Sequence, residues 1–326
     1  MRKIIIQEID DGKKIFNYVK TLLPGIDNSD LFKFFRKKII TVNQSKVDVN
    51  YHVKANDMLT IYLKDEHFKK INTDNQAKFH GISSELFVVF EDKDILAVNK
   101  PAGIIVHPDE NNYKNTLQQI VCAYLYKKGE YNPQNEGYTP SPCHRLDRNT
   151  SGVIVFAKNF HALKNFTGQL RDRKTKKIYV AISSGCIDKP LLIRSMINNE
   201  EQGVTVASLK MYDSNIFERS YYLENFPKES FTLITPIKSN ENASLLTIEL
   251  WTGRKHQIRA HLKAVGSPIL GDHRYKSRRS VYQTGQYGLI RPLLHSYSIE
   301  FEGYPVIIAQ IPDDITKTAG EIFDKT

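Results

Sequence analysis

The chain has 326 residues, of which 40% are hydrophobic and 25% are charged, so a packed core is expected and wholesale disorder is excluded. Lysine and arginine outnumber aspartate and glutamate by 46 to 36, and the resulting net charge of +10 indicates a polyanionic partner such as nucleic acid. Three cysteines are too few for a disulfide framework. No apolar run suits a signal segment or the roughly twenty residues of a membrane span, so we expect a soluble, cytoplasmic protein without a membrane partner.

The first 64 residues are predicted to form a small α/β unit, because apolar residues recur at helical spacing and then give way to strand-like runs. In chain order we expect a helix over residues 15–23 that Pro24-Gly25 stops, a second helix from Asn28 to about Lys38, a strand over 39–42, a turn over 43–46 and a strand over 58–62. Residues 65–84 are polar and are predicted to be a linker.

Residues 85–326 are predicted to form a larger domain. Its expected strands are residues 86–90, 95–98, 104–106, 153–156, 179–182, 231–234, 245–251 and 305–311. Its expected helices are residues 116–126, 161–170 and 256–265. Because strands outnumber helices and do not alternate regularly with them, the predicted fold class is α+β with a mixed, largely antiparallel sheet.

Several common sites are absent from the sequence, which has no P-loop, no dinucleotide-binding glycine fingerprint and no Gly-x-Ser-x-Gly elbow. Zinc ligands were sought among the histidines and cysteines. His256 and His261 are five residues apart and do not share a helix face, while Cys143 and His144 are adjacent and point apart in an extended chain. We therefore predict no metal site.

One stretch combines charge with turn-forming residues. Asp147 lies between Arg145 and Arg148, and two neighbouring guanidinium groups would lower the pKa of the carboxyl group and keep it ionised. Small polar residues follow at positions 149–152, and an apolar strand then anchors the loop. Such a carboxylate can act as a nucleophile or a base, although a salt-bridged turn explains this spacing equally well.

The stretch from His144 to Gly152 reads His-Arg-Leu-Asp-Arg-x-Thr-Ser-Gly and resembles the signature loop of the RluA-type pseudouridine synthases. Two further stretches, Lys176–Ala181 and Leu250–Leu262, resemble the second and third motifs of that family. The third motif continues through Gly266–Asp272 and Tyr275, and lesser hallmarks follow the family order at Lys100–Gly103, His107-Pro108 and Leu294-His295. The likeness runs from about Leu86 to the C-terminus and implies the pseudouridine synthase fold.

The resemblance implies isomerisation of uridine to pseudouridine in RNA, with Asp147 as the catalytic residue and with no cofactor. Attack on the sugar, attack on the base and removal of a ribose proton are all compatible with an ionised carboxylate. The other roles implied by alignment are base displacement by Arg145, packing on the flipped uracil by Tyr179, pairing with Asp147 by Arg259, lining of the site by Leu262 and phosphate contact by Arg148 and Arg254. Arg254 is also the competing candidate for the pairing role.

The N-terminal unit resembles the S-four-like RNA-binding domain through residues 35–43 and 55–61. Arg36, Lys37 and Lys38 are its expected RNA contacts, and a generic basic appendage is the alternative. The combination resembles the family members that modify large-subunit ribosomal RNA, so we expect a monomer with ribosomal RNA as its partner.

One region departs from the family pattern. Residues 193–224 lack the expected short hairpin signature and carry Glu218-Arg219-Ser220-Tyr221 instead, which puts substrate choice in question. Three alternatives stay open: a transfer-RNA substrate, a non-catalytic RNA-binding assembly factor on the same fold, and an N-glycoside hydrolase. The hydrolase would need a second carboxylate to activate water, and Asp272 is the one candidate within the motifs.

Overall fold

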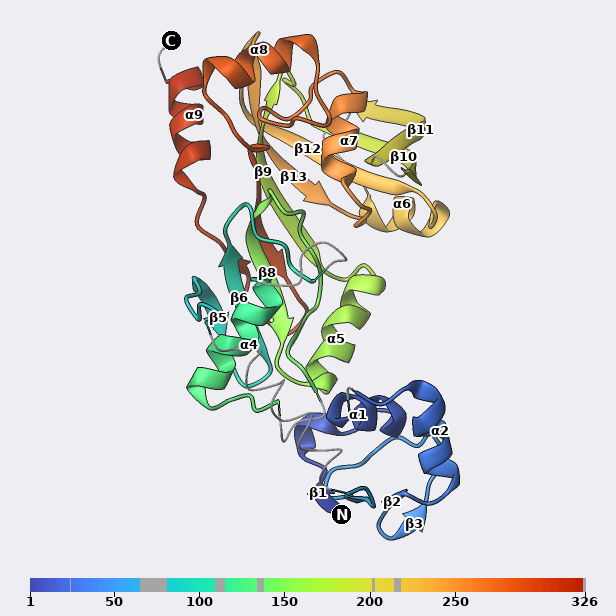
Figure 1. Ribbon diagram of the computed structural model, residues 1–326. Coiled ribbons are helices and arrows are strands. Elements are labelled where there is room, and N and C mark those ends of the chain that lie inside the picture. The colour runs from blue at the N-terminus through green and yellow to red at the C-terminus, as the bar shows by residue number, and fades with distance from the viewer. Residues whose placement is uncertain are drawn as a thin grey trace. The chain divides into compact units, whose positions relative to one another are not determined.

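The computed structural model describes residues 1–23, 25–64, 81–108, 115–133, 138–200, 203–213 and 218–324 (Figure 1). The chain falls into two compact units. One contains residues 1–96, 106–145 and 155–168, and the other contains residues 97–105, 146–154 and 169–326. Most of the predicted linker, residues 65–80, lies outside the described residues, so the boundaries at 64 and 85 stay predictions.

The first unit begins with a short 3-10 turn (Glu8–Asp10) and two helices, α1 (Ile15–Leu22) and α2 (Asn28–Arg36). Both helices were predicted, and the second ends two residues earlier than expected. A four-stranded antiparallel sheet has the order β1 (Arg2–Ile5), β4 (Met58–Ile61), β2 (Ile40–Val42) and β3 (Ser45–Lys46). Strand β1 was not predicted, because its short apolar run was considered only as a signal segment.

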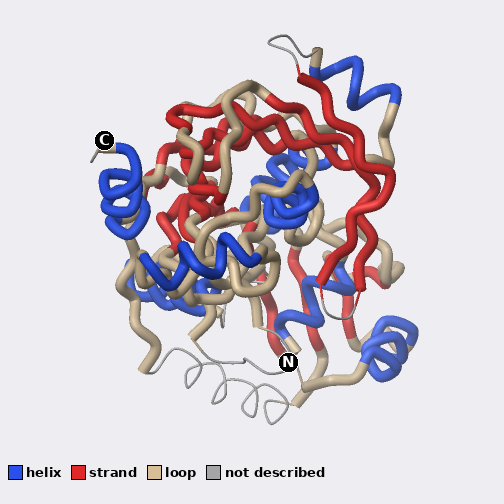
Figure 2. The backbone as a smooth tube through the Cα atoms, turned by 90° about the horizontal axis from the view of Figure 1, so that it is seen from above, coloured by secondary structure: helices blue, strands red, loops and turns tan. Residues whose placement is uncertain are grey.

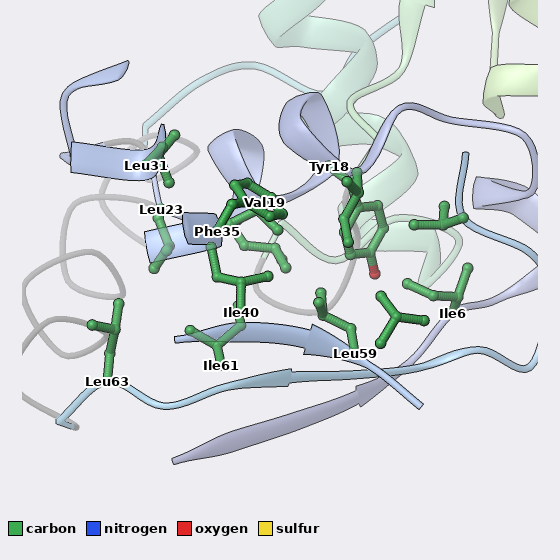
Figure 3. Packing of buried hydrophobic residues seen from close by; sticks show 14 residues of the cluster. Ile6, Tyr18, Val19, Leu23, Leu31, Phe35, Ile40, Leu59, Ile61 and Leu63 are labelled. Atoms are coloured by element: carbon green, nitrogen blue, oxygen red, sulfur yellow. The ribbon is translucent and has the colours of Figure 1, made fainter. Parts of the chain in front are cut away.

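The turn between β2 and β3 is tighter than predicted. Asn43 and Gln44 both have positive φ angles, 48° and 64°, which matches a two-residue hairpin turn, whereas Ser45 and Lys46 belong to the strand. The side chains of α1 and α2 that face the sheet, including Tyr18, Val19 and Phe35, are buried against it (Figure 3). Each such side chain contributes roughly 1.5–3 kcal/mol, so this small sheet has a core of its own.

The rest of the first unit includes β5 (Val88–Glu91), the start of β6 (Ile95–Lys100), α4 (Leu117–Lys128), β7 (Ser141–Pro142) and α5 (Phe160–Arg171). Helix α4 starts at a capping box in which the Thr116 side chain accepts from the Gln119 amide and Gln119 reaches back. The predicted strand over residues 104–106 is wrong, because the chain there forms no ladder.

The large sheet has the order β11-β10-β12-β13-β9-β14-β8-β6-β5, with β15 beside β14 and β7 beside β8. Its remaining strands are β8 (Ser151–Ala157), β9 (Lys176–Ser184), β10 (Leu191–Glu200), β11 (Gly203–Asp213), β12 (Ser230–Ser239), β13 (Ala243–Leu250), β14 (Leu294–Glu300) and β15 (Ile307–Ile308). Strands β9 to β13 pair antiparallel, and β14 pairs parallel with β8. The predicted α+β class with a mixed, largely antiparallel sheet is confirmed.

A long hairpin of β10 and β11 forms the edge of this sheet, within the region where the sequence pattern was unclear (Figure 2). It was missed because Ser195, Asn198 and above all Arg194 interrupt the apolar residues of β10. That guanidinium is buried and forms a bidentate ion pair with Glu229, a partner that lies beyond the hairpin in sequence. This region therefore does contain a hairpin, and it is the sequence of the region that departs from the family pattern.

Four helices belong to the second unit: α6 (Arg219–Asn225), α7 (Gln257–Ala264), α8 (Arg278–Gln286) and α9 (Asp313–Phe323). Helix α7 lies against β11 and β12, while α8 and α9 lie against β9 (Figure 1). Only α7 was predicted. No helix in the described ranges combines the length and apolar character needed to cross a membrane.

Candidate active site

The loop that carries Asp147 enters β8 through a glycine that no other residue could replace without movement. Gly152 has φ +118°, and a Cβ atom on it would lie 2.2 Å from the carbonyl oxygen of Ser296 in β14. The close approach lets β8 and β14 pair in register, with Gly152 opposite Ser296. This explains why the end of the loop motif is a glycine.

A buried lysine supports the same loop from the end of β6. The Nζ atom of Lys100 donates to the carbonyl oxygens of Pro101, Ile104 and Arg148, each at 2.9 Å. The side chain is fully buried, and burial lowers its pKa to about 7 against the opposing influence of Asp147. In the sequence, Lys100 was noted only as part of a lesser family hallmark, and this role was missed. A lysine that ends an apolar strand just before a proline was the available signal.

Asp147 pairs with an arginine from a distant part of the chain. Nη1 of Arg259, on α7, donates to Oδ2 of Asp147 at 2.9 Å, across a sequence separation of 112 residues. The same guanidinium donates through Nε and Nη2 to Asp272 at 2.7 and 3.0 Å. Burial opposes the charge of Arg259, but its contacts with Asp272 and Asp147 outweigh burial and raise its pKa. Arg259 is thus held as a fixed cation between two carboxylates.

Asp272 is fully buried and has no free oxygen. Besides the two bonds from Arg259, its Oδ1 accepts from the backbone amides of Arg274 and Tyr275, both at 3.0 Å. It is also the second partner of Arg259, which was not foreseen. A carboxylate occupied in this way is unsuited to activating water, so the structure does not support the hydrolase alternative.

A histidine and a tyrosine also adjoin Asp147. Nε2 of His256 lies 3.8 Å from Oδ2 of Asp147, and its Nδ1 lies 3.0 Å from the hydroxyl of Tyr275. That hydroxyl accepts a bond from the amide of Val204 at the start of β11. Burial lowers the pKa of His256, and the nearby Arg259, Arg274 and Lys255 add to the effect while Asp147 opposes it. From the sequence, His256 was considered only as a zinc ligand, and its place beside Asp147 was not predicted.

The aligned tyrosine lies on β9 and faces the same site. Tyr179 is buried, and burial, together with the charge of Asp147, raises its pKa to about 12, with a hydrogen bond to Ser296 acting in the opposite direction. The phenol therefore stays neutral near pH 7 and offers a flat ring rather than a charge. Leu262 is fully buried on α7, three residues after Arg259.

The two arginines beside Asp147 are not among its ion-pair partners in the described part of the chain. Arg148 is exposed, and its Nε donates to the carbonyl oxygen of Gly103 at 2.9 Å. Arg145 is exposed as well. Among the described contacts, the ion-pair partners of Asp147 are Arg259 and His256, so the cation that orients the carboxylate comes from tertiary structure. The remaining predicted RNA contacts, Arg36, Lys37, Lys38 and Arg254, are all exposed.

Two further histidines are buried and hydrogen-bonded to hydroxyl groups behind the site. His295 lies 3.0 Å from Ser151 of the loop strand, and His261 lies 2.7 Å from Ser195 and 2.9 Å from Thr232. Burial lowers the pKa of each to about 4. Both are therefore neutral at pH 7. Within the described part of the chain, no group of three or more metal-ligating side chains occurs.

The site thus joins a carboxylate paired with an arginine to a buried tyrosine on a mixed, largely antiparallel sheet. The family model described as RNA pseudouridylate synthase matches residues 94–264. The chain belongs to the RNA pseudouridine synthases of RluA type, and it is an isomerase that acts on RNA.

The chain is 30% identical over 305 residues to ribosomal large subunit pseudouridine synthase C of Vibrio parahaemolyticus. The matched residues make up 91% of this chain and 87% of that protein. It is 29% identical over 306 residues to the protein of the same name from Pasteurella multocida, with 93% and 86% covered. Among solved structures, human RNA pseudouridylate synthase domain containing 4 matches with a TM-score of 0.56 at 20% identity and covers 78% of this chain and 97% of that one. This likeness supports the fold.

Proposed function

We propose that the protein converts specific uridines of large-subunit ribosomal RNA to pseudouridine, with Asp147 as the catalytic carboxylate. The observation that carries the proposal is the ion pair between Asp147 and Arg259, which joins the first and third family motifs at 2.9 Å. The relatives named for the large ribosomal subunit match over most of both chains and support the choice of substrate. A transfer-RNA substrate is the second candidate.

In this proposal the target base leaves its stack and reaches Asp147, while Arg145 occupies the space that the base vacates. Tyr179 packs on the extruded uracil, and a contact of this type contributes roughly 1–3 kcal/mol. The glycosidic bond breaks, the uracil turns, and its carbon five bonds to the ribose. Arg259 orients Asp147 whether the carboxylate attacks the sugar, attacks the base or removes a ribose proton.

The test uses release of tritium from RNA labelled at carbon five of uridine, because forming the new carbon–carbon bond expels that hydrogen. Wild-type protein should release label from ribosomal RNA, and Asp147→Asn, which keeps the size of the side chain, should release none while remaining folded and able to bind RNA. Full release by Asp147→Asn would reject Asp147 as the catalytic residue.

The substrate is tested separately with the same assay. Equal amounts of unmodified ribosomal and transfer RNA, both taken from a strain that lacks the gene, should differ in label released, with ribosomal RNA the preferred substrate. Mapping of pseudouridines in that strain should reveal missing sites in large-subunit RNA. Missing sites confined to transfer RNA would favour the second candidate and leave the enzyme assignment intact.

A further inference from the structure

Four cations gather around Lys177 of β9, and we call this group the cation cluster. Its members are Arg173, Lys177, Arg219 and Arg254. Arg173 and Arg219 join neighbouring segments through hydrogen bonds to backbone carbonyl oxygens. Arg173 donates through Nη1 and Nη2 to the carbonyl oxygens of Leu223 and Pro227, and Arg219 donates through Nη2 to the carbonyl oxygens of Arg173 and Thr175.

The backbone is strained at Arg173. Helix α6, which supplies Arg219, is held in place by aromatic packing. Arg173 has φ +58°, a left-handed conformation that is costly for a residue with a Cβ atom. On α6, the ring of Tyr222 packs against those of Tyr212 and Trp251, with centroids 5.6 and 6.1 Å apart. The guanidinium of Arg219 is therefore held in position by aromatic packing as well as by hydrogen bonds.

Of the four members of the cluster, Lys177 has the charged group with the fewest polar partners among the described residues. Its Nζ atom would lie 3.4 Å from a Cβ atom placed on Gly253, next to Arg254, so the amine sits directly over this glycine. Among the described residues it makes no hydrogen bond or ion pair. Arg219 likewise keeps a buried Nε atom without a hydrogen-bond partner among those residues. Both groups are N–H donors left available inside the cluster.

Positive charge in the cluster greatly exceeds negative charge. One carboxylate approaches it, that of Glu249, whose Oε1 lies 3.3 Å from Nη1 of Arg219. Burial lowers the pKa of Arg173, and the charges of Arg254 and Arg219 lower it further. Burial lowers the pKa of Lys177 to about 8, and the charge of Arg219 adds to the effect. Like charges held this close by neutral carbonyls favour binding of an anion.

We propose that the cation cluster binds a backbone phosphate of the substrate RNA strand beside the target uridine. The inference rests on the proposed function, and two relations link the cluster to the site. Lys177 and Tyr179 are two residues apart on β9, so their side chains leave the same face of the strand about 7 Å apart. Guanidinium groups also match the geometry of phosphate oxygens, which makes a phosphate the fitting anion.

The first test replaces Lys177 with methionine, which removes the charge and keeps the aliphatic stem. Lys177→Met should weaken binding of a ribosomal RNA fragment about tenfold near 150 mM salt and should lower the slope of log affinity against log salt by about 0.7–0.9. Lys317→Met, at an exposed lysine on α9, is the matched control and should change neither quantity. Unchanged affinity and slope for Lys177→Met would overturn the proposal.

The second test uses pH, because phosphate binding requires the protonated amine. Among the described residues, the charged group that acts on Lys177 is Arg219, which pairs with Glu249, and Arg254 follows Gly253, over which the amine lies. Since the pKa of Lys177 in the free protein is about 8, wild-type affinity should fall as the pH rises from 8 to 9.5. Lys177→Arg stays charged and should bind with an affinity that does not change over this range. A matching fall in Lys177→Arg would assign the effect to another group.

The outcomes separate this inference from the proposed function. Binding is measured on an Asp147→Asn background, so that turnover does not alter the RNA. If wild-type protein forms pseudouridine and Lys177→Met keeps the wild-type salt slope, the phosphate site is refuted and the function stands. A neutral methylphosphonate placed next to the target uridine should weaken binding to the lysine form about tenfold and to Lys177→Met much less. Equal weakening of both forms would place that phosphate elsewhere.

Discussion

The Nζ atom of Lys100 donates to the carbonyl oxygen of Arg148, the residue that follows Asp147, at a distance of 2.9 Å. The other two bonds of this amine, to Pro101 and Ile104, belong to its own segment. A single buried cation therefore connects the end of β6 to the backbone of the loop that carries Asp147. The position of the carboxylate depends on this backbone as well as on Arg259.

Replacing Lys100 with methionine should damage stability and catalysis together. The three carbonyl oxygens would lose their donor inside the protein, and each unsatisfied buried acceptor costs about 1–3 kcal/mol. We expect a loss of at least about 2 kcal/mol in the free energy of unfolding, measured by urea denaturation. We also expect at least a tenfold drop in kcat, measured by tritium release under conditions where the variant is folded. Wild-type values for Lys100→Met would show that the loop is held by other contacts.

Asp272 should matter for catalysis although it does not touch the substrate in the proposed function. Asp272→Asn would present an NH₂ group toward the guanidinium of Arg259 in place of an acceptor oxygen. Arg259 should then no longer be held in the position from which it donates to Asp147. The expected result is a tenfold to hundredfold fall in kcat with an RNA dissociation constant within about twofold of wild type. Asp172→Asn, at an exposed ion pair with Arg171, is the matched control. Weakened RNA binding with normal kcat would contradict a positioning role.

The protein should lose stability as the pH falls from about 6.5 to about 4, because His261 and His295 are buried as neutral rings. The unfolded chain takes up protons on these histidines near pH 6.5, whereas the folded chain does so only near pH 4, so protonation favours the unfolded state between these values. Each histidine accounts for about 2–3 kcal/mol. Urea midpoints at pH 7.5 and 5 should differ strongly in wild type and less in His261→Gln. His107→Gln, at an exposed histidine, should behave as wild type.

Local sequence patterns predicted much of the fold but few of the contacts that build the site. Helices α4, α5 and α7 were placed within two residues of both ends, because capping residues and helical spacing are encoded nearby. Strands β10 and β14 and helices α8 and α9 were missed. Helix α9, for example, buries Ile315 and Ile322 against the sheet and begins with Asp313 and Asp314 after Pro312, a helix-start pattern that was overlooked.

For the site as well, the sequence identified individual residues but not the contacts between distant segments. The resemblance marked Asp147, Tyr179 and Arg259, and the structure brings all three into one unit around the start of β8. The burial of Lys100 and the link from His256 through Tyr275 to the β10–β11 hairpin were not predicted, because each depends on segments that meet only in the folded chain. Arg145 and Arg148 are close to Asp147 in sequence, yet its ion-pair partners among the described residues are Arg259 and His256. Neighbours in sequence need not point toward one another.

The hydroxyl of Tyr275 should couple the hairpin to the site. It accepts from the amide of Val204 at 3.0 Å and lies 3.0 Å from Nδ1 of His256. Tyr275→Phe keeps the ring and removes both bonds, so we expect a fivefold to tenfold loss of kcat/KM, which corresponds to about one hydrogen bond. Tyr282→Phe, at an exposed tyrosine on α8, is the control and should retain full activity. Full activity of Tyr275→Phe would show that His256 is positioned without it.

The basic end of α2 should contribute to RNA affinity through charge alone. Lys37 and Lys38 are exposed and lie just beyond the helix, where their amines are free to approach phosphates. The double variant Lys37→Ala, Lys38→Ala should weaken binding of ribosomal RNA and reduce the salt slope by about 1.4–1.8, since two fewer phosphates would be neutralised. Catalysis at saturating RNA should stay within about twofold of wild type, because both residues lie outside the unit that contains Asp147. Lys20→Ala, on the exposed face of α1, is the control, and a double variant with the wild-type salt slope would leave this module without its proposed contact.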